Sequence, residues 1–326
     1  MSSARALGLD VGSTTVKLVA LGDGETLLYH RCERHHGRPA ERARDLYSQA
    51  GAAFSGAPLG ITGSVGVAMA AALCGRPMHE VHAVALAVEK RHPGTQSVVE
   101  LGGQDAKVLL FDQRGQGHAE MNDRCAAGTG ATIDRVAARI GLSERELGRL
   151  TLVGDLSVAA KCGVFAETDV VNLIKQGGSP AAAFSALARG IVVQNLAVLT
   201  RGRVPRPPVL LLGGPHAHLP ILRQAWREAL EELWASQGVA TGPVSAPDHA
   251  ALFAAIGAAE HAARGGRRLP AVGGALDDPR AEPPLMNGEQ SGRAQLTPRA
   301  TAPAGQTPSP PGYRRRLDDE QDRAAR

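Results

Sequence analysis

The stretch Ala6–Leu21, with the sequence ALGLDVGSTTVKLVAL, decides the fold. Its two apolar runs, Ala6–Asp10 and Val16–Leu21, have the composition of β-strands, and a Gly-Ser-Thr turn joins them. This pattern predicts a compact α/β unit. The further elements predicted for this unit are strands at Thr26–Arg31 and Leu59–Thr62, a helix at Pro39–Ala53, and an Ala-rich helix that runs through Leu73.

The Gly-Ser-Thr turn is the first candidate for binding phosphate. Gly12 lets the backbone come close to a ligand, the N–H and hydroxyl groups that follow suit phosphate oxygens, and Asp10 suits a hydrated Mg²⁺. An ordinary hairpin can have the same turn, so the motif alone is a weak signal. The candidate nucleotide-binding residues of this segment are Gly12, Ser13, Thr14, Thr15 and Lys17.

A second strand-turn-strand segment, Ser97–Phe111 with the sequence SVVELGGQDAKVLLF, repeats this arrangement. Its two carboxylates, Glu100 and Asp105, suit the waters of a nucleotide-bound metal or the orientation of an attacking water. With Asp10 they are the candidate catalytic residues. A lysine follows each turn, and each lysine either neutralises phosphate or is a solvated strand residue. The candidate nucleotide contacts here are Gly102, Gly103, Gln104 and Lys107.

A third motif, the pair Gly213 and Gly214, ends the apolar run Val209–Leu212, and its bare backbone suits a base and ribose. The three motifs in this order resemble the superfamily of acetate and sugar kinases, heat-shock ATPases and actin over residues 6 to about 260. The resemblance implies an α/β, actin-like ATPase with two RNase H-like lobes around a nucleotide cleft. We expect lobe I at 1–94, regaining a helix at 250–263, and lobe II at 95–249.

Two cysteines, Cys125 and Cys162, stand in Gly-rich or Ala-rich segments that precede predicted helices. Iron-sulfur clusters usually take four cysteines, so two thiolates are too few. If both are ligands, the missing pair comes most simply from an identical subunit across a two-fold axis. The alternative is two buried free cysteines. We interpret the other two, Cys32 and Cys74, as small apolar fillers.

Four segments, 10–14, 102–107, 122–130 and 162–167, resemble one branch of the superfamily in detail. This branch comprises the ATPase activators of 2-hydroxyacyl-CoA dehydratases and the ATPase subunits of benzoyl-CoA reductases. The resemblance implies that Cys125 and Cys162 bind one 4Fe-4S cluster shared in a homodimer. It also implies that hydrolysis of ATP to ADP with Mg²⁺ drives an electron to an iron-sulfur acyl-CoA dehydratase or reductase, and that ferredoxin or flavodoxin supplies the electron.

The chain departs from this family at three places. Ser64–Val67 stands where the family has a Tyr and a basic residue, Glu100 replaces the usual Asp, and two histidines, His216 and His218, follow the last glycine pair. We interpret these histidines as surface polar residues. Two alternatives therefore stay open. One is a small-molecule (amino sugar) kinase with Asp105 as base, and the other is an ATP-responsive regulatory module.

Composition narrows the class of protein. Hydrophobic residues make up 43% of the 326, enough for a substantial core, whereas aromatic residues at 3% are too few for stacking on single-stranded nucleic acid. Residues 264–326 hold 11 Arg against 8 acidic residues, which leaves a formal charge of +1 for the rest. We predict no nucleic-acid partner, no membrane partner and a cytoplasmic location. Residues 264–326 are predicted to be a disordered tail.

Overall fold

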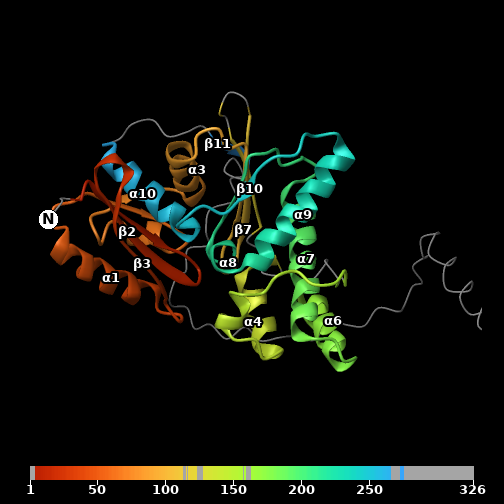
Figure 1. The fold of residues 1–326 in the computed structure, drawn as a ribbon. Helices are drawn as coiled ribbons and strands as arrows, with labels where there is room; N and C mark the ends of the chain where they lie inside the picture. Colours follow the sequence, from red (N-terminus) through yellow and green to blue (C-terminus); the bar gives the residue numbers. More distant parts are fainter. Residues whose placement is uncertain are drawn as a thin grey trace, which may run out of the picture. The chain divides into compact units, whose positions relative to one another are not determined.

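The first part of the chain forms a mixed β-sheet in the computed structural model (Figure 1), with the strand order β3-β2-β1-β4-β5. Its central strand β1 pairs antiparallel with β2 and parallel with β4. The strands are β1 (Ala6–Val11), β2 (Thr15–Leu21), β3 (Leu27–Arg34), β4 (Leu59–Thr62) and β5 (Arg76–Pro77). The structure describes residues 4–112, 115, 117–122, 128–156, 158, 163–265 and 272–274, all of them within the unit Met1–Pro283.

A second mixed sheet has the order β10-β9-β6-β7-β8-β11. Its central strand β6 pairs antiparallel with β7 and parallel with β9, as β1 does with β2 and β4. The order β8-β7-β6-β9-β10 therefore repeats β3-β2-β1-β4-β5, which confirms the internal duplication expected of an actin-like fold. The strands are β6 (Ser97–Leu101), β7 (Ala106–Phe111), β8 (Gly117–Asn122), β9 (Val209–Leu212), β10 (Val244–Ser245) and β11 (Val272–Gly274).

Two apolar helices, α3 (Glu80–Arg91) and α10 (Phe253–Ala263), form the layer shared by the two sheets. Their side chains belong to one buried cluster that also includes Val19 from β2 and Leu109 from β7. The helices approach each other closely, because a Cβ on Gly257 would clash with the backbone of Ala83. Figure 1 shows α10 against β2 and α3 beside it. Burial of this layer is what holds the two sheets together.

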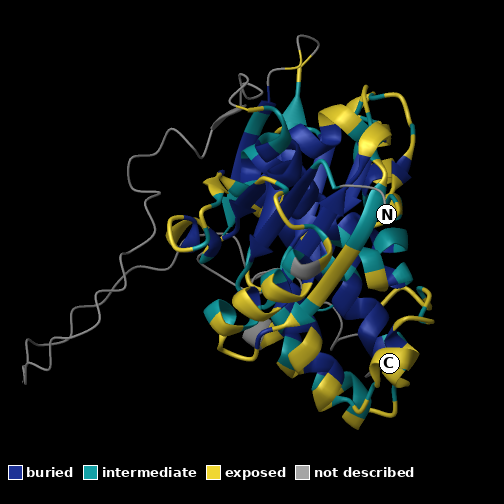
Figure 2. Cartoon of the chain, turned by 90° about the vertical axis from the view of Figure 1, so that its left-hand side faces the viewer, coloured by how far each residue is buried: buried dark blue, intermediate teal, exposed yellow. Residues whose placement is uncertain are grey.

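The outer faces of the sheets are covered by separate groups of helices. Helix α1 (Pro39–Ala53) packs on the first sheet, and α4 (Gly130–Arg139), α6 (Gly163–Lys175), α7 (Pro180–Leu199) and α9 (Pro220–Gln237) cover the second. The remaining helices are α2 (Gly66–Met69), α5 (Glu144–Leu147) and α8 (Gly214–His218), with 3-10 turns η1 (Asp23–Glu25) and η3 (Ala250–Leu252). Figure 2 shows the buried residues concentrated in the strands and the exposed residues on the outer helices.

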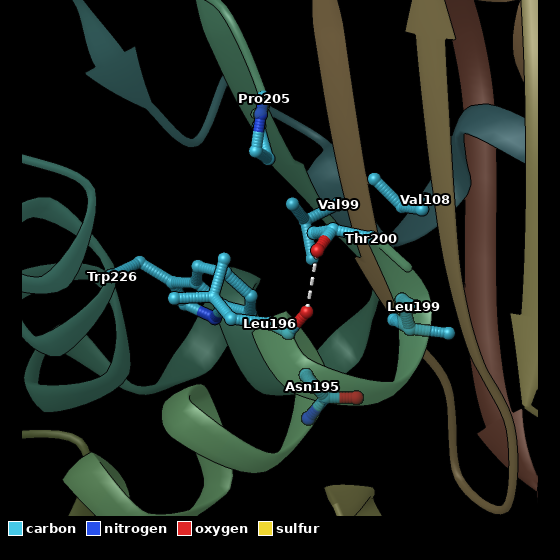
Figure 3. A pocket seen from close by; sticks show the side chains of 8 residues that line it. All are labelled: Val99, Val108, Asn195, Leu196, Leu199, Thr200, Pro205 and Trp226. Carbon is cyan, nitrogen blue, oxygen red and sulfur yellow. Dashed lines mark hydrogen bonds between the residues drawn. The ribbon is translucent and has the colours of Figure 1, made fainter. Parts of the chain in front are cut away.

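Helix α7 is long and apolar enough to cross a bilayer by length and composition. However, 67% of its most apolar window is buried inside the protein, where α7 packs against α6 and α9. A narrow apolar crevice lies beside its C-terminal turn, between Trp226 of α9 and Val99 of β6 (Figure 3). The crevice has no room for a water molecule. We therefore interpret α7 as a core helix and the crevice as a packing gap.

Several elements differ from the expectations. The Ala-rich helix predicted to run through Leu73 is only the short helix α2, and helix α3 occupies a stretch for which no element was predicted. Cys32 and Cys74 are exposed, so their interpretation as small apolar fillers is wrong. Val272–Gly274, inside the segment predicted to be disordered, form β11 and pair in parallel with β8.

Candidate functional site

The central strand of each sheet carries a carboxylate opposite a lysine. Asp10 of β1 stands directly across from Lys17 of β2, and Glu100 of β6 stands directly across from Lys107 of β7. In both cases the pair lies beside a Gly-containing turn. The two sheets thus share these side chains as well as their strand order, and each sheet has an acid–lysine pair at the carboxyl end of its central strand, β1 or β6.

The first pair is a direct ion pair. Lys17 Nζ lies 2.8 Å from Asp10 Oδ2, and the Asp10 side chain is fully buried. Burial by itself would lower the pKa of Lys17, but the attraction and hydrogen bond of Asp10 outweigh it and raise that pKa above its usual value. The second oxygen, Asp10 Oδ1, is buried and has no hydrogen-bond partner among the described residues. Such an atom is costly unless a water or a cation completes it.

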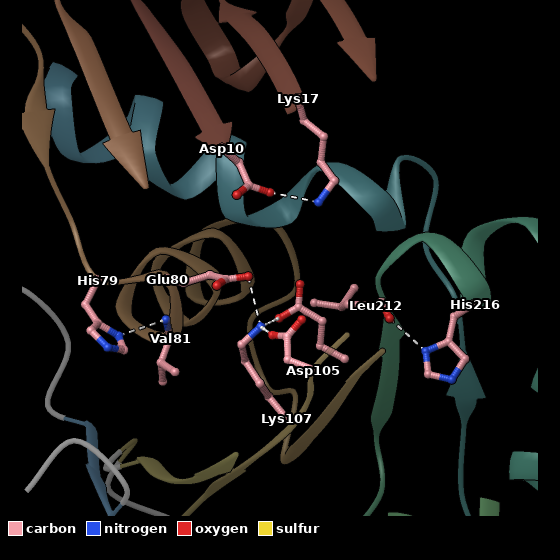
Figure 4. A network of polar contacts seen from close by, with 10 residues as sticks. Asp10, Lys17, His79, Glu80, Val81, Asp105, Lys107, Leu212 and His216 are labelled. Atoms are coloured by element: carbon pink, nitrogen blue, oxygen red, sulfur yellow. Dashed lines mark hydrogen bonds and ion pairs between the residues drawn. The ribbon is translucent and has the colours of Figure 1, made fainter. Parts of the chain in front are cut away.

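The second pair is part of a larger cluster around Lys107, which is only 1% exposed. Lys107 Nζ lies 2.5 Å from Asp105 Oδ2, 2.9 Å from Glu80 Oε1 and 3.6 Å from Glu100 Oε2. Burial alone would lower the pKa of Lys107, but these three carboxylates raise it well above its usual value. Figure 4 shows the ammonium between the carboxylates of Glu80 and Asp105, with Asp10 and Lys17 nearby.

The three carboxyl groups of this cluster titrate differently. Burial raises the pKa of Glu80 to about 7 and also raises the pKa of Glu100. Burial would raise the pKa of Asp105 as well, but the Lys107 ammonium outweighs it and holds that pKa below the usual range. Asp105 is therefore the member of the cluster that carries a full negative charge at neutral pH.

The two glycine-bearing turns lie against each other. A Cβ on Gly103 would clash with the side chain of Thr14, so only glycine permits this approach. The second turn is also tied to the start of α4. The Gly130 N–H donates to the Gly102 carbonyl at 3.0 Å, and the Ala131 N–H donates to the Gly103 carbonyl at 2.7 Å. The turns thus form one continuous site, and α4 is anchored directly on it.

The third glycine motif lies next to the second turn. Gly213 has a φ of 91°, which favours glycine, and a Cβ there would clash with the Leu101 carbonyl. His216, two residues past the motif in α8, is fully buried, and its Nδ1 lies 2.7 Å from the Leu212 carbonyl oxygen. The expectation of a surface residue is therefore wrong for His216, whereas His218 is exposed.

The structure thus brings together most of the residues singled out in the sequence. Of the second turn, Gln104 is the exposed member. Cys125 and Cys162 lie outside the described residues. Within the described ranges, the side chains of His, Cys, Asp and Glu form no group of three or more that is placed to hold a metal ion. Glu80 was not predicted from the sequence, where its one signal is an acid directly ahead of the apolar run Val81–Val88.

The duplicated sheets, the shared helix layer and the paired turns define an actin-like ATPase fold. The model of the BadF/BadG/BcrA/BcrD ATPase family matches residues 7–262. The chain therefore belongs to this ATPase family.

Two relatives are similar to this chain over nearly their whole length. The 2-hydroxyisocaproyl-CoA dehydratase activator of Clostridioides difficile is 29% identical over 262 residues, 78% of this chain and 94% of that protein. The (R)-2-hydroxyglutaryl-CoA dehydratase activating ATPase of Acidaminococcus fermentans is 25% identical, covering 79% and 98%. A benzoyl-CoA reductase polypeptide of Thauera aromatica is 27% identical over 52% of this chain and 64% of that protein.

Solved structures agree with this assignment. The Clostridium difficile activator with bound ADPNP superposes with a TM-score of 0.67 at 26% identity, covering 80% of this chain and 94% of that one. Component A of the Acidaminococcus fermentans dehydratase superposes with a TM-score of 0.64 at 24% identity, covering 80% and 98%. The second likeness supports the fold alone.

Proposed function

We propose that this protein is an ATP-hydrolysing activator that drives a low-potential electron to a 2-hydroxyacyl-CoA dehydratase or to an enzyme of the benzoyl-CoA reductase type. One observation carries the proposal. The dehydratase activator of Clostridioides difficile is similar to this chain over 94% of its own length in sequence, and its ADPNP-bound structure has the same fold. The named sequence relatives support this function over the sugar-kinase alternative.

We assign ATP to the joined turns, with Mg²⁺ beside Asp10. The fully buried Asp10 Oδ1 has no hydrogen-bond partner among the described side chains, so a metal-bound water there would satisfy it. Asp105 would orient the attacking water, and Glu100 would accept from the metal's waters. The backbone contacts to nucleotide would come from Gly12, Ser13, Thr14, Thr15, Gly102, Gly103, Gln104, Gly213 and Gly214.

The two lysines would act differently from simple phosphate contacts. Lys17 is bound to Asp10 and Lys107 is enclosed by three carboxylates, so neither ammonium is a free cation in the described structure. We propose that Lys17 holds Asp10 and that Lys107 holds Asp105, each fixing a carboxylate for the metal and its waters. Because the Lys17 side chain is 14% exposed, we propose that its ammonium also contacts a phosphate of the bound nucleotide.

We propose further that Cys125 and Cys162 of two identical subunits bind one 4Fe-4S cluster at a two-fold axis, as the family resemblance implies. When bound, the cluster supplies the one-electron chemistry. Helix α4 would connect the cluster to the nucleotide site, because it starts five residues after Cys125 and is hydrogen-bonded to the second turn. Closure of the turns on nucleotide would therefore move the start of α4.

We also propose boundaries for the two lobes and a cellular compartment for the protein. Lobe I would comprise 1–94 together with 250–263, and lobe II would comprise 95–249. An electron carrier such as ferredoxin or flavodoxin would reduce the protein in the cytoplasm. The free, exposed thiols of Cys32 and Cys74 support a reducing compartment.

Iron analysis of protein purified without oxygen tests the cluster assignment. We expect about four iron and four sulfide per dimer, since two cysteines per chain supply four ligands only across a two-fold axis. Cys125→Ser and Cys162→Ser should each abolish the iron. Cys32→Ser and Cys74→Ser are matched controls, because both thiols are exposed and free, and they should retain it. Full iron content in a monomer would disprove the shared site.

A further inference from the structure

Glu80 belongs to the Lys107 cluster although it comes from a different part of the chain. It is the first residue of α3, and its Oε1 accepts a hydrogen bond from Lys107 Nζ at 2.9 Å, 27 residues further along. The N-terminal end of α3 is itself fixed, because the side chain of His79, the residue before the helix, accepts a hydrogen bond from the Val81 N–H at 3.3 Å. The carboxylate of Glu80 is thus aimed at the second turn by a capped helix.

The cluster leaves Lys107 little freedom. An ammonium has three donors, and Glu80 and Asp105 take two of them while Glu100 lies 3.6 Å away. Without Glu80, the Lys107 ammonium would turn toward the remaining carboxylates of Glu100 and Asp105. The Asp105 carboxylate would then no longer be held in one position. A displacement of about 1 Å of a catalytic group costs on the order of 100-fold in rate.

Glu80 also connects the second turn to the layer between the sheets. Helix α3 packs on α10, where a Cβ on Gly257 would clash with the Ala83 backbone. Helix α10 in turn contacts β1, the strand that carries Asp10. The hydrogen bond from Lys107 to Glu80 is therefore a direct link between the turn of the second sheet and the helix layer that supports the first.

We propose that Glu80 is a positioning residue for ATP hydrolysis, which holds Lys107 and through it the Asp105 carboxylate. The proposal rests on the proposed function of the site. In the reaction, one water adds to the γ-phosphorus and the bond to the bridging oxygen breaks, giving ADP, inorganic phosphate and a proton. In this role Glu80 would contact Lys107 and neither the water nor the nucleotide. It acts by keeping Asp105 in place.

Steady-state ATPase kinetics of the full-length protein with Mg-ATP test this role. Glu80→Ala should lower kcat roughly 10- to 100-fold with KM for Mg-ATP within about threefold, because nucleotide contacts remain. Glu80→Gln keeps an acceptor oxygen of the same reach and should recover most of the loss. Glu89→Ala, an exposed glutamate on the same helix, is the matched control and should leave kcat unchanged.

Asp105→Ala separates this inference from the proposed function. If Asp105→Ala hydrolyses ATP at the parental rate, the catalytic assignment of the site is wrong. If Asp105→Ala is inactive while Glu80→Ala retains the parental kcat, the site stands and the role of Glu80 is overturned. Equal losses in Glu80→Ala and Glu80→Gln, together with a lower thermal midpoint, would also overturn it, because they would indicate a role in folding alone.

Discussion

Buried ionisable residues cluster around the two turns, and their surroundings decide which of them carry charge. Asp105 stays ionised beside Lys107, whereas burial raises the pKa of Glu80 to about 7. For the basic residue His216, burial has the opposite effect and lowers the pKa to about 4, so this histidine is neutral at pH 7. Asp105 could be predicted as a site residue from the sequence, but the protonation states of these groups could not, since a pKa depends on neighbours that only tertiary packing supplies.

His216 should make the stability of the protein depend on pH. Its folded pKa of about 4 lies below the value of 6.5 that it has when exposed, so the unfolded chain binds more protons between these values. Its contribution is therefore present above pH 6.5 and is lost as the pH falls toward 4. We expect the free energy of unfolding to fall by about 2 kcal/mol from this residue between pH 7 and pH 5.

Chemical denaturation at pH 7 and pH 5 measures this loss. His216→Gln removes the titrating group, and the difference between the two pH values should shrink by about the same 2 kcal/mol. His218→Gln is the control, because His218 is exposed in the same short helix. An identical pH dependence in the parent and in His216→Gln would show that His216 does not titrate between the folded and unfolded states.

At the scale of elements, the helix layer between the sheets depends on small residues. Gly257 in α10 faces the Ala83 backbone of α3, whereas Gly51 in α1 has no other atom near the position of a Cβ. Gly257→Ala should lower the free energy of unfolding by about 1 to 3 kcal/mol, because the added methyl forces the helices apart. Gly51→Ala should raise it by up to about 1 kcal/mol through helix propensity.

Urea unfolding curves of the two glycine variants compare their stabilities directly, since both introduce the same methyl group into a helix. Opposite signs are the expected result. A Gly257→Ala protein as stable as the parent would show that α3 and α10 pack less closely than the structure has them.

The elements that could be predicted were those with clear local patterns. The strand-turn-strand segments, α1 and β4 appear where the apolar runs and turn residues placed them. Helix α3 escaped prediction because its stretch Ala83–Val88 is continuously apolar and buried, so no alternation of apolar and polar residues reveals a helical period there. Glu80 was missed with it. Its contact with Lys107 joins two segments that lie 27 residues apart in the chain, and local sequence does not encode such a contact.

At the scale of the whole molecule, the two halves of the duplication contact each other at the turns and also at their surface. Arg34, at the end of β3, lies 2.9 Å from Asp134 of α4, and the Gly103 turn lies against Thr14. Both contacts lie on elements directly beside the turns. A nucleotide bound between the turns would therefore favour one arrangement of the two halves. Helix α4 would shift with this change, because its start is hydrogen-bonded to the second turn.

An activator and a kinase use such a change differently, and this gives the last prediction. A kinase binds its acceptor hydroxyl beside the nucleotide, so the acceptor speeds ATP turnover and becomes phosphorylated. An activator uses ATP to change what a second protein can reach. Under anaerobic conditions, with Mg-ATP and a strong reductant, the protein should support reduction of an iron-sulfur acyl-CoA dehydratase, and Cys125→Ser should not. ATP turnover should be unaffected by glucose, N-acetylglucosamine or glucosamine. Stoichiometric phosphorylation of any of these sugars, equally fast in Cys125→Ser, would establish a kinase instead.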